Sequence, residues 1–403
     1  MIAKIKKSNL KGCLKAVPSK SFLHRMLICA ALSEGRSRIG NVIKSEDILA
    51  SIDCIRSLGA EVIEEGDSLM IRGIGRKMTE NAAFPCRESG STLRFFIPVA
   101  AALCEKATFT GSERLMERGI GIYEDALGSK GIKFSKEKGD LNVEGKLISG
   151  IYEIPGNISS QYITGLLFAL PLLGGDSEIR VLPPVESRPY IDITISVLKL
   201  AGIEVEEPER NRFLIKGNSS FRPLDTDAEG DWSNAAFLYA MNGLGAEIEV
   251  SGLNGSSVQG DRICVENFKK LDKPHETIDI GGCIDLGPVL FAYASAKNGG
   301  HFTGTERLKI KESDRAAVMA EELLKFGVKA EIKENEVIIP EGGVKAPTKR
   351  LDSHNDHRIV MALTVLLMLT GGEIGGIEAV RKSYPGFFED LRRIGLDVEI
   401  NEG

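Results

Sequence analysis

The sequence predicts an α/β protein (α+β repeats) built from six repeated units, each combining a helix with a β-hairpin. A phrase marked by a glycine returns along the chain, and starts of apolar helices recur about 70 residues apart, with one shorter interval. The composition is that of an ordinary globular protein, with 42% hydrophobic and 27% charged residues over 403 positions. Because the units are longer than solenoid repeats, two groups of three packed units are a natural alternative to a rod.

The repeated phrase consists of a helical stretch, a marker glycine, a strand, a charged turn and a second strand. Glycine adopts the left-handed conformation of a helix C-cap without strain, and alternating apolar and polar residues around a charged turn are typical of a hairpin. The segment 268–280 stands where a further copy belongs and lacks the glycine. The copies span 55–73, 126–145, 197–217, 322–342 and a truncated 391–400, and their markers are Gly59, Gly131, Gly202, Gly327 and Gly395.

Each unit also begins an apolar helix with basic, small, acidic or hydroxyl-bearing residues. The starts are marked by Lys20, Gly90, Ser159, Asp231, Asp285 and Asp356. A helix N-terminus carries roughly half a positive charge and several unpaired N–H groups, so that converging N-termini form an anion-binding cavity. The same residue types occur as ordinary helix caps, but their return at one repeat position favours the anion site.

Charge and hydropathy exclude several other classes of protein. The net charge is −6 and no basic block is present, which argues against a general nucleic-acid binder. The longest apolar runs, 95–104 and 359–369, are shorter than the roughly 20 residues that span a bilayer. The N-terminus resembles neither a signal peptide nor a transit peptide, so we expect a cytoplasmic protein. The seven cysteines are scattered without a C-x-x-C pair, which supports neither a zinc site nor a disulfide framework.

The sequence lacks the motifs of ATP-binding loops, zinc hydrolases and serine hydrolases. Basic and hydroxyl-bearing segments stand out instead, several of them at the helix starts. They are 17–25, 88–94, 111–118, 156–161, 186–194, 310–315, 355–358 and 381–385.

In this order and spacing, these segments resemble those of the 5-enolpyruvylshikimate-3-phosphate synthase family, the 3-phosphoshikimate 1-carboxyvinyltransferases. The most specific pieces are P-S-K-S at 18–21 with Arg25, S-S-Q at 159–161, S-R-P-Y-I-D-I-T at 187–194, K-E-S-D-R at 311–315, N-D-H-R at 355–358 and K-S-Y-P at 382–385. The resemblance covers residues 11–390.

The resemblance implies the enolpyruvyl transferase fold, an inside-out α/β barrel of two similar globular domains, each with three βαβαββ units. One domain would span 18–227 and the other 1–17 plus 228–403, with hinge crossovers near 16–18 and 226–230. The helix N-termini would be directed at the cleft between the domains.

The resemblance also implies a reaction. The enolpyruvyl group of phosphoenolpyruvate would pass to the 5-hydroxyl of shikimate 3-phosphate through a tetrahedral intermediate, releasing phosphate in the shikimate pathway to chorismate and aromatic amino acids. No metal or organic cofactor is expected. The expected partners are these two small substrates, with no nucleic acid and no membrane, and the expected state is a monomer. Two phosphates and two carboxylates would enter one site, which explains the many Lys and Arg side chains.

Matching positions imply the site residues. Asp285 is the leading candidate for the base, Lys311 and Glu312 are candidates for proton transfer at the enol carbon, and Lys20 would touch both substrates. The phosphoenolpyruvate set is Lys20, Gly90, Arg114, Gln161, Arg315, Arg358 and Lys382. The shikimate 3-phosphate set is Lys20, Ser21, Arg25, Ser159, Ser160, Gln161, Ser187, Tyr190, Asp285, Arg307 and Lys311.

Several alternatives stay open at this point. UDP-N-acetylglucosamine enolpyruvyl transferases share the fold, but they open with a Lys-Asn pair and carry a loop cysteine. Here the pair is Lys20-Ser21, and no cysteine lies between Cys104 and Cys264. A non-catalytic repeat scaffold is the other alternative, although it would not need cations gathered at helix starts.

Some residues depart from the family pattern or favour a structural role. Glu88 replaces a common Asn and Arg307 replaces an Asn that contacts the substrate phosphate in some members, which leaves the ligand contacts there open. We expect Arg118 and Arg188 to orient their neighbours, His357 to pack beside the site and Trp232 to pack in the core.

Overall fold

The computed structural model describes residues 1–402, and the chain forms two compact units. The N-terminal unit is Pro18–Glu229, and the C-terminal unit combines Met1–Val17 with the chain from Gly230 onward. Each unit has its own hydrophobic core. Within residues 1–402, no helix is both long and apolar enough to cross a membrane.

The N-terminal unit contains three four-stranded sheets, with the strand orders β14-β3-β5-β4, β6-β7-β9-β8 and β10-β11-β13-β12. Its helices are α1 (Lys20–Leu32), α2 (Glu46–Ser57), α3 (Gly90–Leu103), α4 (Glu113–Glu117), α5 (Gly121–Gly128), α6 (Ser160–Ala169) and α7 (Arg188–Leu200). Its strands are β3 (Arg36–Gly40), β4 (Glu61–Glu65), β5 (Ser68–Arg72), β6 (Thr79–Pro85), β7 (Cys104–Thr110), β8 (Lys133–Glu137), β9 (Asp140–Glu144), β10 (Ile151–Pro155), β11 (Ser177–Leu182), β12 (Val205–Glu209), β13 (Arg212–Ile215) and β14 (Asp225–Asp227).

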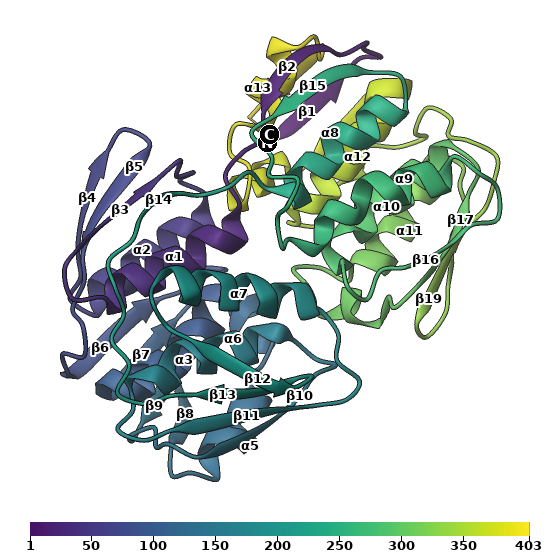
Figure 1. Ribbon diagram of the computed structural model, residues 1–403. Helices are drawn as coiled ribbons and strands as arrows, with labels where there is room; N and C mark the ends of the chain where they lie inside the picture. Colours follow the sequence, from purple (N-terminus) through teal and green to yellow (C-terminus); the bar gives the residue numbers. More distant parts are fainter. Residues whose placement is uncertain (403) are drawn as a thin grey trace. The chain divides into compact units, whose positions relative to one another are not determined.

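In each of these sheets a parallel pair is followed by an antiparallel hairpin. Strands β6 and β7 run parallel, and β9 joins antiparallel to β7 and then to β8. The third sheet repeats this order with β10, β11, β13 and β12. Figure 1 shows the sheets around a centre of helices, and α3 is buried along nearly all of its length. This arrangement confirms the predicted βαβαββ unit with its helices inside.

The C-terminal unit repeats the plan with one departure. Its helices are α8 (Trp232–Gly243), α9 (Cys264–Leu271), α10 (Gly287–Ala296), α11 (Arg315–Lys325), α12 (His357–Thr370) and α13 (Phe387–Arg393). Its strands are β1 (Ile2–Ile5), β2 (Lys11–Lys15), β15 (Glu247–Ser251), β16 (Thr277–Asp279), β17 (Gly300–Thr303), β18 (Glu331–Ile332), β19 (Glu336–Ile339), β20 (Leu351–Asp352), β21 (Gly372–Gly375) and β22 (Val398–Asn401). They form the sheets β15-β2, β16-β17-β19-β18 and β20-β21-β1-β22.

The departure is the sheet of β2 and β15, which has two strands within residues 1–402. The segment 268–280 was the copy without a marker glycine, and here the chain passes from α9 directly into β16 of the next sheet. His275 in this segment has a φ of 60°, but no hairpin strand forms between α9 and β16 in the described residues. The unit therefore has one incomplete repeat, where the sequence predicted a full βαβαββ module.

The predicted marker glycines all adopt positive φ, as a helix C-cap requires. Their φ angles are 102° at Gly59, 92° at Gly131, 75° at Gly202, 85° at Gly327 and 109° at Gly395.

Five of the six predicted helix starts fall at the beginning of a helix. Ser159, Asp231 and Asp356 are N-caps whose side chains accept a backbone N–H from the first turn of α6, α8 and α12. Lys20 and Gly90 are the first residues of α1 and α3. Asp285 differs because it lies in the 3₁₀ turn η3 (Ile284–Leu286) that precedes α10 and caps no helix. Its carboxylate contacts cations instead.

Candidate active site

Asp285 lies at the centre of a cluster of charged side chains in the C-terminal unit. Its Oδ1 accepts a hydrogen bond of 2.9 Å from Arg315 Nη1 and lies 3.1 Å from Lys311 Nζ. Its Oδ2 accepts one of 3.2 Å from Arg358 Nη2. The three cations come from the segment before α11, the start of α11 and the first turn of α12. They stabilise the negative charge of Asp285 in the form that can accept a proton.

Arg315 holds the cluster together. The side chain is 1% exposed, and its guanidinium also contacts Asp356 Oδ2 at 2.8 Å and Glu312 Oε2 at 2.7 Å. Burial alone would lower the pKa of Arg315, but the carboxylates of Asp356, Glu312 and Asp285 raise it above its ordinary value. With three carboxylates around one rigid fork of donors, the relative positions of Asp285 and Glu312 are fixed before any substrate binds.

Lys311 has the opposite electrostatic setting. Burial lowers the pKa of its ammonium, Asp285 raises it, and the neighbouring cations Arg315 and Arg307 lower it further. The net shift is downward. A lysine in this setting releases its proton more readily than an exposed one, which suits it to acid–base chemistry.

Two further predicted residues of this unit donate to backbone carbonyls of different loops. Lys382 lies at the end of η5 (Ile377–Lys382). Its Nζ donates a hydrogen bond of 2.6 Å to the carbonyl of Asn355, which lies just before α12. Arg307, in η4 (Glu306–Ile310), is buried and donates 2.6 Å to the carbonyl of Gly281. His357 is buried with its Nδ1 3.7 Å from Asp356 Oδ1, in keeping with a packing role.

The N-terminal unit holds a second cluster around Arg25, a buried residue of α1. Its guanidinium donates to Thr194 Oγ1 at 2.8 Å, to the Ser21 carbonyl at 2.7 Å and to the Tyr190 carbonyl at 2.9 Å. These acceptors are all neutral. A buried cation surrounded by neutral oxygens attracts an anionic ligand, because its charge has been removed from water without a countercharge.

Lys20 is placed differently. Its Nζ forms a 2.7 Å salt bridge with Asp47 of α2, and both side chains are largely buried. An acidic partner holds the ammonium at the first residue of α1.

A third group of residues surrounds Gln161 in the first turn of α6. Arg94 Nη1 donates a hydrogen bond of 2.6 Å to Gln161 Oε1, and Gln161 Nε2 donates one of 2.9 Å to Ser91 Oγ. Gly90 begins α3 beside them: a Cβ on Gly90 would lie 3.0 Å from Arg118 Nη1 and 3.1 Å from Arg94 Nη1. The absence of a side chain at Gly90 therefore gives a ligand direct access to backbone and guanidinium groups.

The structure does not bring Arg114 to this group. Arg114 is exposed on the short helix α4, whereas Arg118, the C-cap of α4, lies against Gly90. The two arginines are four residues apart in the segment 111–118, and spacing alone did not show which of them faces inward. Arg94, which the predicted site does not include, also belongs to this group through its contact with Gln161. Its position one turn after Gly90 on α3 was the available signal.

The remaining predicted residues frame α6 and α7. Ser159 caps α6, and Ser160 is its buried first residue. Ser187 precedes α7, is buried and has a φ of 55°. Arg188 binds Asp192 at 2.8 Å and Glu207 at 2.6 Å, which supports the predicted orienting role.

The structure also shows the surroundings of Glu88 and Trp232. Glu88 is exposed, directly before the buried Ser89 and Gly90. Trp232 donates from Nε1 to the Asn254 carbonyl at 3.0 Å and stacks on Tyr239 with ring centroids 5.9 Å apart, so that it packs as predicted.

One group of side chains could offer ligands to a metal. Donor atoms of Glu321, Glu322 and His354 lie within 4.8 Å of one another. However, Glu322 Oε1 already binds Lys325 Nζ at 2.7 Å, and its Oε2 accepts from the Asp352 amide at 3.0 Å. The group is better explained as an anchor between α11 and β20.

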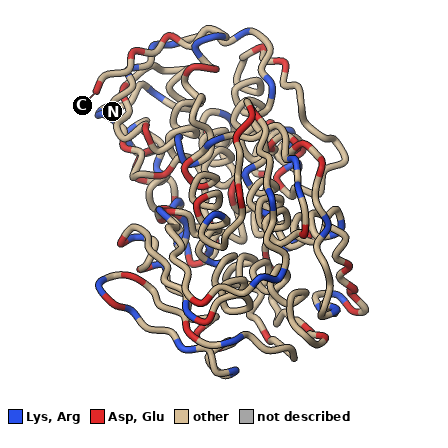
Figure 2. The backbone as a smooth tube through the Cα atoms, turned by 90° about the vertical axis from the view of Figure 1, so that its left-hand side faces the viewer, with Lys and Arg blue, Asp and Glu red and all other residues tan. Residues whose placement is uncertain are grey.

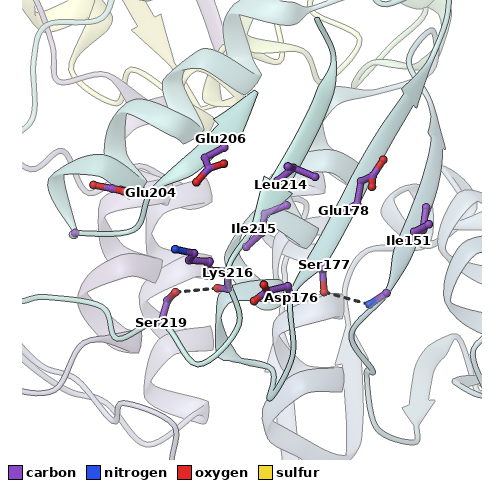
Figure 3. A pocket seen from close by; sticks show the side chains of 12 residues that line it. Ile151, Asp176, Ser177, Glu178, Glu204, Glu206, Leu214, Ile215, Lys216 and Ser219 are labelled. Carbon is purple, nitrogen blue, oxygen red and sulfur yellow. Dashed lines mark hydrogen bonds between the residues drawn. The ribbon is translucent and has the colours of Figure 1, made fainter. Parts of the chain in front are cut away.

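A cavity of about 490 Å³ lies at the sheet of β10, β11, β13 and β12. Figure 3 shows acidic side chains such as Glu204, Glu206 and Asp176 around it, with Lys216 as a cation. None of the predicted site residues is among those that line it in the described part of the chain. Figure 2 shows positive and negative residues interleaved along the backbone, so a functional assignment rests on the local clusters rather than on a field of one sign.

Comparisons with solved structures define the class of fold. The chain is similar to EPSP synthase from Acinetobacter baumannii, with a TM-score of 0.81 and 23% identity over 100% of this chain and 99% of that one. It is also similar to the enolpyruvyl transferase NikO from Streptomyces tendae, with a TM-score of 0.78 and 14% identity over 99% and 98% of the two chains. The fold is that of the enolpyruvyl transferases.

Comparisons of sequence give the family. Residues 5–391 match the family described as EPSP synthase (3-phosphoshikimate 1-carboxyvinyltransferase). The 3-phosphoshikimate 1-carboxyvinyltransferase of Clostridium kluyveri is 42% identical over 98% of this chain and 97% of its own length, and that of Clostridium perfringens is 39% identical over 96% and 97%. The chain belongs to the EPSP synthase (3-phosphoshikimate 1-carboxyvinyltransferase) family.

Family membership confirms the predicted activity. The enzyme transfers the enolpyruvyl group of phosphoenolpyruvate to shikimate 3-phosphate, a step in the biosynthesis of aromatic amino acids. The two alternatives, transfer to a UDP-sugar and a non-catalytic scaffold, do not agree with this membership.

Proposed function

We propose that the clusters around Asp285, Arg25 and Gln161 carry this reaction, with the C-terminal unit supplying the acid–base groups. The observation that supports this most is the Asp285 carboxylate, bound by Arg315 and Arg358 and close to Lys311. A carboxylate held ionised in a fixed position is suited to accept the proton of the shikimate 5-hydroxyl as its oxygen attacks.

The attacked carbon must first be activated by protonation of the methylene carbon of phosphoenolpyruvate. Lys311 is the better donor of the two candidates, because its pKa is lowered chiefly by burial. Glu312 accepts a hydrogen bond of 2.7 Å from Arg315. This contact favours the charged form of the Glu312 carboxylate and makes Glu312 a weaker proton donor. After attack of the 5-oxygen, the tetrahedral intermediate expels phosphate and returns one proton of the new methyl group to the enzyme, which forms the enol ether of the product.

The N-terminal unit supplies anion-binding groups. Arg25, with Ser21, Ser159, Ser160, Ser187 and Tyr190, binds the phosphorylated shikimate, and the neutral surroundings of Arg25 support this role. Gly90, Gln161 and Lys20 bind phosphoenolpyruvate together with Arg118, which takes the role that the sequence gave to Arg114. Arg315, Arg358, Lys382 and Arg307 keep their proposed substrate contacts in the C-terminal unit.

The enzyme acts on these two small substrates as a cytoplasmic monomer, with no nucleic acid and no membrane involved. The net charge of −6 and the absence of a basic block in the sequence support the exclusion of nucleic acid. Sedimentation of the purified protein tests the monomeric state.

The primary test is phosphate release from phosphoenolpyruvate by the purified protein. We expect release that depends on shikimate 3-phosphate and is not supported by UDP-N-acetylglucosamine. Release with the UDP-sugar alone would overturn the assignment. Release that survives both Asp285→Ala and Arg25→Ala would show that the clusters described here do not carry the reaction.

A further inference from the structure

Asp261 is a buried acid that the sequence analysis did not single out. It lies in the 3₁₀ turn η2 (Gly260–Ile263), and its residue is 5% exposed. The adjoining Gln259 connects this turn to the start of α8. Its Nε2 donates a hydrogen bond of 2.8 Å to the Gly230 carbonyl, and its Oε1 accepts one of 3.1 Å from the Trp232 amide. The Gln259 side chain therefore holds the turn that carries Asp261 against the start of α8.

A chain of hydrogen bonds connects Asp261 to the Asp285 cluster. Ser233 Oγ donates to Asp261 Oδ2, and Arg358 Nη2 donates to the same Ser233 Oγ at 2.9 Å. The same Nη2 also donates to Asp285 Oδ2 at 3.2 Å. Since a serine hydroxyl has one proton, its donation to Asp261 leaves the lone pairs of the oxygen for Arg358. The charge of Asp261 therefore sets the donor direction of the hydrogen bonds that run from Arg358 through Ser233 to Asp261.

The surroundings of Asp261 make its charge sensitive to pH. It faces Asp231 at the start of α8, Asp285 in η3, Arg358 in α12 and the buried thiols of Cys264 and Cys283. Burial and Asp285 raise the pKa of Asp261 to about 6, against the lowering effects of Arg358 and Ser233. This carboxyl therefore changes charge just below neutral pH.

The charge of Asp261 opposes folding stability. A folded pKa above the unfolded value means that the native state binds the proton more tightly, so the contribution to stability is present at low pH and is lost as the pH rises through about 6. A buried acid kept at the expense of stability, and connected to the base of the reaction, is suited to a functional role.

We propose that Asp261 is a positioning residue that acts through Ser233 to hold the Arg358 guanidinium against Asp285, and that it sets part of the acid side of the pH–rate profile. This inference rests on the proposed roles of Arg358 and Asp285. Ionised Asp261 orients the Ser233 proton away from Arg358, and its negative charge makes Asp285 a stronger base. When Asp261 is protonated, both effects are lost.

Asp261→Asn tests this proposal, because the amide retains the shape and a polar contact to Ser233 without the charge. We expect kcat/KM for phosphoenolpyruvate at pH 7.5 to fall about tenfold, the effect of losing a charged hydrogen bond. Between pH 7.5 and 5 the ratio of wild type to variant should shrink toward one, since the wild-type carboxyl is then itself neutral. The variant should be at least as resistant to urea at pH 7.5 as the wild type.

Three further variants make the outcome decisive. Ser233→Ala should reproduce the loss, and Asp261→Asn should add little to it if the two residues act in one chain. Asp272→Asn removes a carboxylate that binds Tyr293 Oη at 2.7 Å and should leave the pH profile unchanged. Arg358→Ala tests the underlying role: if it is active, the proposed function fails.

If Arg358→Ala is inactive while Asp261→Asn keeps the wild-type rate and profile, only the present inference is overturned. A uniform loss of rate in Asp261→Asn at all pH values, with lower resistance to urea, would likewise overturn it in favour of a structural role.

Discussion

The two units treat their buried cations in opposite ways. In the N-terminal unit, Arg25 and Arg94 donate to neutral oxygens of Thr194, Tyr190 and Gln161. In the C-terminal unit, Arg315 and Arg358 donate to the carboxylates of Asp285 and Asp356 or to a serine. Lys20, paired with Asp47, is an exception in the first unit, and Arg307, which donates to the Gly281 carbonyl, is an exception in the second.

With the proposed roles, this difference would separate anion binding in one unit from acid–base chemistry in the other. A cation among neutral acceptors gains a countercharge only when a phosphate or carboxylate binds, so its burial favours the liganded state. A cation that already holds carboxylates gains less from an added anion, but it fixes the position and charge of the acid and base. Substitutions should therefore affect binding in the first unit, and rate or stability in the second.

The largest expected effect is on the rate in the C-terminal unit. Asp285→Asn removes the proposed base while preserving the shape of the side chain, and kcat should fall by about 100- to 10,000-fold. Phosphate release under saturating substrates measures it, with circular dichroism as the check on folding. If the variant is folded, keeps its kcat and shows only a raised KM, Asp285 belongs with the binding groups instead.

The next effect contrasts the two kinds of arginine. Arg315→Ala should destabilise the protein by about 3–5 kcal/mol, because it leaves three carboxylates without their cation. Arg25→Ala should leave stability nearly unchanged and raise KM for shikimate 3-phosphate by about 10- to 100-fold, as expected for a lost charge-assisted hydrogen bond. Urea titration and initial rates measure the two quantities. Equal loss of stability in both variants would remove the distinction between the units.

A smaller effect separates the paired arginines of the segment 111–118. Arg118→Ala should raise KM for phosphoenolpyruvate about tenfold, since the Arg118 guanidinium lies beside Gly90. Arg114→Ala is the matched control, because the side chain is exposed and four residues away. The reverse result would restore the assignment made from the sequence.

The smallest effect concerns Gly90 itself. Gly90→Ala would bring a methyl group to 3.0 Å from Arg118 Nη1, an atom at the end of a side chain that can shift. KM for phosphoenolpyruvate should rise about fivefold, the scale of adding a methyl group to a packed site, with kcat retained. An unchanged KM would mean that the ligand does not approach the start of α3.

Capping signals could be predicted from the sequence because they act over a few residues. The marker glycines and the caps Ser159, Asp231 and Asp356 all occupy the expected backbone positions. The missing glycine in 268–280 even marked the incomplete repeat, although its consequence for the sheet was not foreseen.

Contacts between distant elements could not be predicted in this way. Whether Arg114 or Arg118 faces inward depends on how α4 packs, which the spacing of charges does not specify. The contacts of Asp261 form only where η2, α8, η3 and α12 pack together, and no short sequence motif predicts that packing. Asp285 resembles a helix cap in the sequence and instead binds three cations.

The position of β1 has a consequence for how the protein is made. Its residues pair with β21 on one side and with β22 on the other, with Ile2 opposite both Gly375 and Asn401. Synthesis proceeds from the N-terminus, so this strand leaves the ribosome before the whole N-terminal unit and acquires both partners only after β21 and β22 have been made. The N-terminal unit, being one continuous stretch, can form during translation. The unit that carries the proposed base must wait for the synthesis of β22.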